Sequence, residues 1–370
     1  MNNGHGNGPK RPDRERVESI SGPNFPKTCM HLPGNSAPSM PGKATPAVER
    51  SDTQSDAAIG THRKRRIHAP RAKRHGRGRT PAADEISQTL KAVWSRYRRQ
   101  LRRGQKRLSI EAVHDLRVQT RRLLVCLDLF APVIGCAEEL AAAHKTLEKR
   151  LGALGPLRDA HVQLINLDAR LADFPEMTPL HVYLRRRANR LTRSVTKTLR
   201  KTGTSKLGHW LGVIRRNVGS KLKDHEAVDR LRTAYLQSWQ EGGTALAAAR
   251  ADHFRGEGKV HDARISLKHL RYGSEALPAS ARTFTAAKLK RLKKSVAGLG
   301  QIHDLDVHMQ RIAKLEEKGR LAPAATASYR AELARCRGRL VTECARLSRE
   351  TAPSRADPAK SPVDQAAEND

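Results

Sequence analysis

The sequence predicts an all-α protein, and three observations favour that class. Between about residues 81 and 350, apolar residues recur at the three- and four-residue spacing of amphipathic helices. No stretch shows the sustained apolar–polar alternation of a half-buried strand. Two separate motifs also recur in the same order in both halves, which indicates duplication of a helical unit. The simplest architecture is therefore a pair of pseudo-symmetric four-helix bundles.

The helical spacing divides each half into five segments, with repeat one at about 83–201 and repeat two at about 224–350. Prolines and glycines set the divisions, because both residues interrupt helices. The glycine-punctuated segment 202–223 is predicted to be a hinge between the halves. The predicted helices cover residues 83–104, 109–130, 137–153, 159–172, 178–201, 224–250, 258–277, 283–298, 303–318 and 323–350.

The segments outside residues 81–350 are predicted to be disordered. Residues 1–80 are rich in Gly, Pro, Asn, Ser and Arg, and they have too few apolar positions to offset the entropy of ordering. The end of this arm is a block of Arg and Lys without acidic residues. It is either a nonspecific anion-binding arm, with nucleic acid as one candidate partner, or a solubilising leader. Residues 351–370 are polar and proline-containing, and they form a predicted disordered tail.

The net charge indicates an anionic partner. Seventy-one Lys and Arg stand against 37 Asp and Glu, which gives a formal charge of +34 and favours nucleic acid, an anionic membrane surface or inorganic polyphosphate. No apolar run reaches the roughly 18 residues of a membrane span, and no apolar secretory signal is found. The five cysteines are scattered and form no CxxC pair, so neither a disulfide framework nor a thiolate metal site is indicated. A cytoplasmic protein is predicted.

A histidine opens the same pattern of cations in each half. His114 is followed at positions three and seven by Arg117 and Arg121, and the pattern recurs 147 residues later from His261. This spacing places the cations on one side of a helix, beside its apolar stripe. Long basic side chains at such a border bury their stems and direct their charged heads into a groove. The cations of the second copy are Arg264, Lys268 and Arg271.

Two purely structural interpretations compete with a binding role for these residues. A single Arg-rich helix is usually a solvated surface, and a single histidine usually hydrogen-bonds a neighbouring element. Arg122 and His269 fall outside the shared side of their helices and are predicted to face outward. Because the pattern occurs twice at matching positions, the binding interpretation is favoured over the structural ones.

The second repeated motif spans residues 154–159 and recurs 145 residues later. Gly155 and Gly300 are interpreted as C-terminal stops of one helix, and Asp159 and Asp304 as N-caps of the next. In an alternative role, either aspartate orients an arginine of the binding face through a charge-assisted hydrogen bond. The preceding helices carry further cations that could wall the same groove, namely Lys145, Lys149, Lys290, Lys293 and Lys294.

Motifs for several kinds of catalysis are missing from the sequence. It contains no GxxxxGK[ST] loop, no GxGxxG turn after a strand, no HExxH helix and no nucleophile elbow. It also shows no carboxylate cluster for a divalent metal and no histidine pair at metal-ligand spacing. A binding protein without cofactor, metal or enzymatic activity is therefore expected.

The two histidine motifs, residues 113–123 and 261–272, resemble those of the CHAD (conserved histidine α-helical domain) family, and the likeness covers about residues 83–350. The resemblance implies two pseudo-symmetric four-helix bundles and a basic central cavity that binds inorganic polyphosphate. It also implies association with polyphosphate granules. The implied phosphate contacts are His114, Arg117, Arg121, Arg122, His261, Arg264, Lys268 and Arg271.

The chain departs from the family pattern at two positions. Leu124 stands where a basic residue matching Arg271 is common, and His269 stands where Lys or Arg is usual, so weaker binding is expected in the first half. The arm lacks the ExExK strand of the triphosphate tunnel domain to which some members are fused, which implies a stand-alone binder. A nonspecific nucleic-acid-binding protein is the alternative, although aromatic residues make up only 4% of the chain and offer few stacking platforms.

Overall fold

The computed structural model describes residues 80–218, 223–282 and 284–351, and these residues are almost entirely α-helical. Within these ranges there is no strand, and the one β-type contact is an isolated bridge between Ile134 and Val218. The predicted all-α class is confirmed. The predictions for the arm, residues 1–80, and for the tail, residues 351–370, concern segments that lie outside the described residues except at their inner ends.

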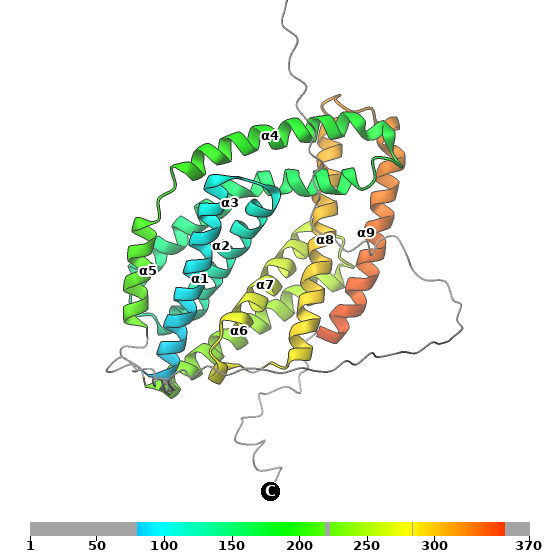
Figure 1. Cartoon of the computed structure of the whole chain (residues 1–370). Coiled ribbons are helices and arrows are strands. Elements are labelled where there is room, and N and C mark those ends of the chain that lie inside the picture. The colour runs from blue at the N-terminus through cyan, green and yellow to red at the C-terminus, as the bar shows by residue number, and fades with distance from the viewer. Residues whose placement is uncertain (1–79, 219–222, 283, 352–370) are drawn as a thin grey trace, which may run out of the picture. The chain divides into compact units, whose positions relative to one another are not determined.

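Nine α-helices are present in the described part of the chain (Figure 1). In both halves, four helices follow the same order and each packs on the next, as a duplication predicts. One additional helix, α5, lies between the two sets. The helices are α1 (Pro81–Lys106), α2 (Ile110–Phe130), α3 (Ala137–Asp168), α4 (Thr178–Arg200), α5 (Ser205–Asn217), α6 (Asp224–Ala251), α7 (Glu257–Ala276), α8 (Ala286–Glu316) and α9 (Pro323–Thr351).

Side-chain caps fix the start of three of these helices. The hydroxyl of Thr80 accepts a hydrogen bond from the Ala83 amide at the start of α1, and Pro81 occupies the first helical position, where its missing N–H costs nothing. Ser109 caps α2 and Thr285 caps α8 in the same way. Each cap satisfies an amide that the helix itself leaves without a partner, so these starts are encoded locally.

Helices α3 and α8 are continuous through the second repeated motif, so the predicted breaks at Gly155 and Gly300 are wrong. The predicted separate helices 159–172 and 303–318 are the C-terminal parts of α3 and α8. Asp159 and Asp304 are therefore not N-caps. A glycine costs about 1 kcal/mol and a proline about 3 kcal/mol inside a helix, and Pro156 lies inside α3. Burial of flanking leucines, each worth roughly 1.5–3 kcal/mol, offsets this cost.

The predicted hinge, 202–223, is also wrong, because most of this segment forms α5. Leu207, Leu211 and Ile214 are buried against the first half. The absence of a Cβ at Gly208 lets the backbone approach Trp94 of α1, whose nearest ring carbon would lie 3.4 Å from a Cβ at that position. Tertiary burial thus stabilises a short helix whose glycines lower its intrinsic propensity.

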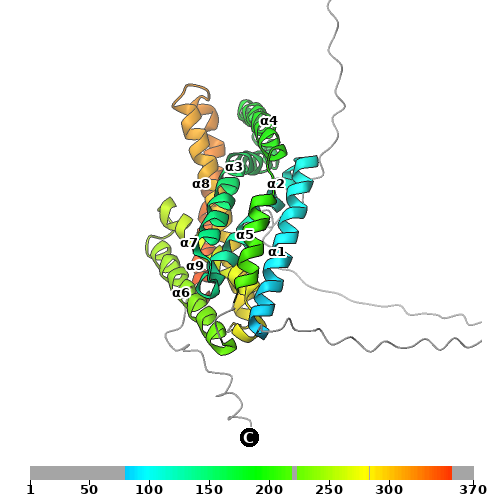
Figure 2. The same ribbon diagram turned by 90° about the vertical axis from the view of Figure 1, so that its left-hand side faces the viewer.

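The two halves share their hydrophobic core. The larger cluster of buried side chains runs from α1 and α2 through α7 to α6 and α8. A smaller cluster joins the end of α3 and the start of α4 to α8 and α9, with Leu180, Ile312 and Tyr329 fully buried. In the view of Figure 2, α1 and α5 lie toward the right and α8 lies toward the left. No described helix has an apolar stretch long enough to cross a membrane. This shared core holds α2 against α7.

Candidate functional site

Basic side chains from α2, α3 and α7 lie close together where the two halves meet. Burial is the largest cause that lowers the pKa values of Arg117, Arg264 and Lys268, and the charge of Arg121 lowers all three further. Such coupling requires proximity. Two aspartates and three histidines border these cations. We call the group the central cluster: Arg117, Arg121, Arg158, Arg264 and Lys268, with His114, His261, His303, Asp159 and Asp304.

Six of the predicted site residues belong to the central cluster, three from each histidine motif. Two further members, Arg158 of α3 and His303 of α8, were not predicted as site residues. They occupy equivalent positions, each directly before the aspartate of the second repeated motif. The repeated position before the aspartate was the signal in the sequence that could have identified these two residues. It points to the cluster only if the motif is helical, because a turn would direct the side chains elsewhere.

The side chains on α2 and α3 are positioned by a backbone contact. Arg117 Nη1 donates a hydrogen bond to the Leu151 carbonyl of α3 at 2.9 Å. A Cβ at Gly155 would lie 3.6 Å from the same nitrogen, so the guanidinium packs directly over the α3 backbone. Because Pro156 has no N–H, the usual helical hydrogen bond to the carbonyl of Gly152 is missing, and this gap lies beside the contact. The glycine–proline motif therefore serves the site and does not end a helix.

The corresponding contacts on α7 leave part of a buried arginine without a partner. Arg264 Nη2 lies 3.4 Å from His261 Nδ1, which must accept because a guanidinium only donates. The rings of His261 and His303 are 5.3 Å apart between centroids. Arg264 is only 7% exposed, and its Nε has no hydrogen-bond partner among the described residues. A buried donor of this kind favours an external acceptor.

The central cluster is electrostatically costly. Burial, together with the charges of Arg264 and Arg121, lowers the pKa of Lys268 to about 7. Burial and Arg121 lower the pKa of Arg117 to about 10, and burial with Arg264 lowers the pKa of His303 to about 4. The carboxyl of Asp304, by contrast, has its pKa raised by burial against the opposing effect of Arg158. Two aspartates thus do not neutralise the cluster, and an added anion would relieve its repulsion.

Arg122 and Arg271, predicted phosphate contacts, lie in a different setting. Arg122 Nη2 is 2.9 Å from Glu275 Oε2, and Arg271 Nε is 3.5 Å from the other oxygen of the same carboxylate. Both guanidinium groups lie over the ring of Tyr272, at 5.5 and 5.6 Å from its centroid. Leu124, the departure from the family pattern, is buried in the larger hydrophobic cluster. Unlike the central cluster, these two cations have a carboxylate partner.

The prediction that Arg122 and His269 face outward is incomplete, since both connect α2 to α7. His269 Nε2 lies 3.3 Å from Asp128 Oδ2, while Arg122 pairs with Glu275. His269 follows Arg122 by 147 residues, and Glu275 follows Asp128 by the same interval. The two pairs are therefore reciprocal, as expected for a pseudo-twofold relation between the halves.

The five predicted wall residues do not join the central cluster. Their side chains are exposed, and none has a hydrogen bond or ion pair with another described residue: Lys145, Lys149, Lys290, Lys293 and Lys294. Within the described ranges, no group of His, Cys, Asp or Glu side chains is arranged to hold a metal ion. The site is thus a cluster of cations between helices of both halves.

Comparisons with known proteins point to one family. The family model described as CHAD domain matches residues 85–313. Among solved structures, the CHAD domain from the plant Ricinus communis is similar over 78% of this chain and 92% of its own, with a TM-score of 0.54 and 19% identity. PptA from Streptomyces chartreusis is similar over 74% of this chain and 99% of its own, with a TM-score of 0.56 and 19% identity. A comparison with curated protein sequences gives no match.

Proposed function

Because the chain belongs to the CHAD domain family, we propose that the central cluster binds inorganic polyphosphate. One observation carries the proposal: five basic side chains from three helices lie together, and none forms an ion pair or a hydrogen bond with a carboxylate of the described residues. Such an arrangement is destabilising by itself, because each charge is partly desolvated beside like charges. A bound polyanion would neutralise it.

The chemistry of the cluster suits a linear, repetitive anion. Arginine offers a planar fork that matches two phosphoryl oxygens, and lysine offers a mobile point charge. A mixture of the two tolerates changes of register along a chain of identical units. Because α2 and α7 contribute equivalent cations, a chain lying between them would meet similar contacts from both halves. The exposed lysines Lys145, Lys149, Lys290 and Lys294 are proposed contacts for the outer parts of a longer chain.

The proposal is for binding, with no catalytic step. We place this binding in the cytoplasm, as the scattered cysteines indicate, and at polyphosphate granules, as the family resemblance implies. Nucleic acid is the alternative ligand for the cluster, and competition separates the two. If short duplex DNA displaces long-chain polyphosphate from the protein at equal phosphate concentration, polyphosphate is not the preferred ligand.

Two variants test the cluster directly in a calorimetric titration with polyphosphate. We expect Arg264→Gln and Lys268→Met each to weaken binding about 10–100-fold, the range for loss of a charge-assisted hydrogen bond. Lys314→Met, which removes an exposed cation of α8 outside the cluster, is the matched control and should bind normally. Thermal melting confirms folding, and Lys268→Met should not destabilise because it removes a partly desolvated charge. Wild-type affinity in both folded variants would disprove the assignment.

A further inference from the structure

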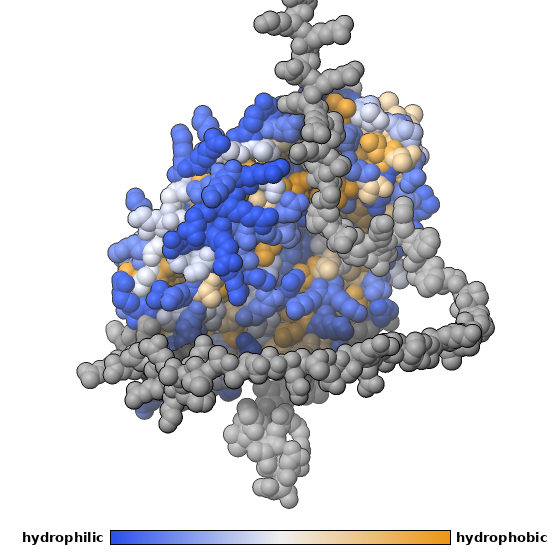
Figure 3. Space-filling view, in the orientation of Figure 1, coloured by the Kyte–Doolittle hydropathy of each residue, from blue (hydrophilic) through white to orange (hydrophobic). Residues whose placement is uncertain are grey.

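A second group of cations lies on the outer surface of the first half. No Asp or Glu occurs between residues 86 and 110, a range that covers most of α1, or between 177 and 223, a range that covers all of α4 and α5. Figure 3 shows a broad hydrophilic area over α1 and the adjoining helices. Charge on this side of the molecule is therefore almost entirely positive.

Six cations of α1 and of α4 with its C-cap residue form what we call the outer basic face: Arg99, Arg102, Lys106, Lys197, Arg200 and Lys201. All six side chains are exposed, and none has a hydrogen bond or ion pair with another described residue. On each helix they lie opposite the buried stripe, so they point away from the core.

The two helices are in contact at the end that carries these cations. Gln105 Nε2 of α1 donates hydrogen bonds to the carbonyls of Leu199 and Thr202, at 2.9 and 3.0 Å. A Cβ at Gly104 would lie 3.7 Å from Leu199 Cδ1, so the backbones approach closely there. The outward surfaces of α1 and α4 consequently adjoin.

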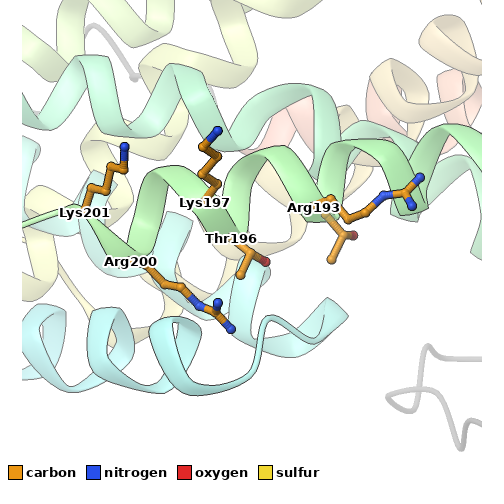
Figure 4. A pocket seen from close by; sticks show the side chains of 6 residues that line it. Arg193, Thr196, Lys197, Arg200 and Lys201 are labelled. Carbon is orange, nitrogen blue, oxygen red and sulfur yellow. The ribbon is translucent and has the colours of Figure 1, made fainter.

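A depression runs along α4 within this face. It has a volume of about 410 Å³ and is lined by Thr192, Arg193, Thr196, Lys197, Arg200 and Lys201. Figure 4 shows Lys197 and Lys201 projecting from one side of α4 and Arg200 from the other. Cations thus border the depression on both sides and two hydroxyl groups lie within it, an arrangement suited to phosphate oxygens.

Carboxylates separate the outer basic face from the central cluster. Asp115, at the start of α2, forms an ion pair with Arg103 of α1 at 3.1 Å, and its charge also acts on the neighbouring His114. Glu111, one turn earlier, lies near Arg103 as well. The charges that shift the pKa values of the central cluster include none from the outer basic face. We therefore treat the two sets of cations as separate sites.

We propose that the outer basic face binds the phosphate backbone of a nucleic-acid duplex, independently of base sequence and of the central cluster. Successive cations at i and i+4, such as Lys197 and Lys201, are about 6 Å apart along a helix axis. Two adjoining helices present more than one such row. Several rows suit an anion with two separate lines of charge, whereas a single thin chain needs only one.

Other features of the face agree with this ligand. Arginines are well suited to phosphate oxygens, and the scarcity of aromatic residues favours contact with the backbone over contact with bases. A membrane surface fits less well because insertion requires exposed apolar anchors. Among the described residues the large exposed apolar side chains are Val182, near the other end of α4, and Ile265 of α7.

Two full-length variants with the same net charge test the proposal. The face variant carries Arg99→Gln, Arg102→Gln, Lys197→Gln and Arg200→Gln. The control variant carries Arg255→Gln, Lys314→Gln, Lys318→Gln and Arg320→Gln, which removes four exposed cations of the second half. Both keep the basic segment within residues 1–80, so any contribution of that segment is equal. Fluorescence anisotropy with a short DNA duplex, and separately with an RNA duplex, measures affinity between 50 and 200 mM salt.

Loss of up to four phosphate contacts should reduce the slope of log affinity against log salt by about 3–4 for DNA. Between 50 and 200 mM, wild-type affinity should then fall about 100-fold more than that of the face variant. The control variant should keep the wild-type slope. A loss seen with only one kind of duplex supports the proposal and identifies the source of the phosphates. Affinity for polyphosphate should be unchanged in the face variant. Failure of the duplex proposal would therefore not change the assignment of polyphosphate to the central cluster.

Three outcomes would overturn the proposal. Equal slopes in the face and control variants would show that only net charge matters. Loss of binding to anionic lipid vesicles, with duplex binding intact, would assign the face to a membrane. Parallel loss of polyphosphate and duplex binding would make the face part of the polyphosphate site. Thermal melting checks folding, and the double variant Arg102→Gln/Arg200→Gln, with about half the change in slope expected, replaces the quadruple one if that does not fold.

Discussion

The two halves of the molecule share their apolar positions but differ in how permanently their cations are charged. Arg121 of the first half corresponds to Lys268 of the second, and Arg158 corresponds to His303. At these two positions the first half therefore presents guanidinium groups, which stay charged at every ordinary pH. The second presents a lysine with a pKa of about 7 and a histidine with a pKa of about 4.

This difference places a lysine with a pKa near neutral pH in the second half, at the position where the first half has an arginine. A duplication begins with identical halves, and the core must keep its apolar pattern to remain folded. Charged positions at the junction are freer to change, because their partners lie in the opposite half. Exchanging residues between equivalent positions is thus a direct way to test what each half contributes.

The largest effect is expected from a buried histidine of the second half. His308 is fully buried, its Nε2 lies 3.1 Å from the hydroxyl of Tyr329, and burial lowers its pKa to about 4. The equivalent residue of the first half is Gln163. Because the folded pKa is below the unfolded value of about 6.5, stability from this group is present above pH 6.5 and is lost as pH falls toward 4.

We expect His308→Gln to remove about 3 kcal/mol of the pH dependence of unfolding between pH 6.5 and 4. Denaturant unfolding of wild type and variant at both pH values measures it. His161 of α3 is also buried, with a pKa lowered to about 4, so the variant should keep the dependence due to that residue. An unchanged difference between the two pH values would show that His308 does not titrate on unfolding.

An intermediate effect is expected for polyphosphate binding. A bound anion should raise the pKa of Lys268 from about 7, so binding takes up a proton near neutral pH. Affinity should then fall by up to about tenfold from pH 7 to pH 8. Lys268→Arg, which copies Arg121 of the first half, should bind with nearly constant affinity over this range.

Calorimetry in buffers of different ionisation enthalpy measures the proton uptake, and Arg121→Lys is the matched exchange. That variant should show a second pH-dependent group or a steeper decline. Equal pH dependence in wild type and Lys268→Arg would remove Lys268 as the source and leave the asymmetry of the halves without a functional consequence.

The sequence predicts the halves better than it predicts their junctions. The all-α class, most helix starts and the shared side of the two histidine motifs follow from local spacing and caps such as Thr80 and Ser109. The continuity of α3 through Gly155 and Pro156 does not, because it depends on burial against other helices. Arg158 was missed for the same reason, since a turn at this motif would direct the side chain elsewhere. Lys145 and Lys290 lie outside the cluster, and their predicted contact with phosphate stays a prediction.

The smallest effect is expected at the reciprocal junction pairs. Arg122–Glu275 and His269–Asp128 occupy equivalent positions, but histidine is charged only over part of the pH range. The side chains of His269 and Asp128 are 30% and 38% exposed, so a permanent ion pair there should be worth at most about 0.5 kcal/mol. His269→Arg should accordingly raise the melting temperature at pH 8 by about 1–2 °C.

The comparison requires a background in which the pair cannot form. In the Asp128→Asn background, His269→Arg should give no gain in melting temperature, because the new guanidinium would have no carboxylate at this position. His144 also lies 3.0 Å from Asp128, so the background variant itself will be less stable than wild type. The difference between the two gains isolates the pair, as in a double-mutant cycle. Equal gains in both backgrounds would mean that the junction tolerates either residue and that its asymmetry is neutral. A gain confined to the background that retains Asp128 would show that the His269–Asp128 pair contributes less to stability than an arginine pair at the same position.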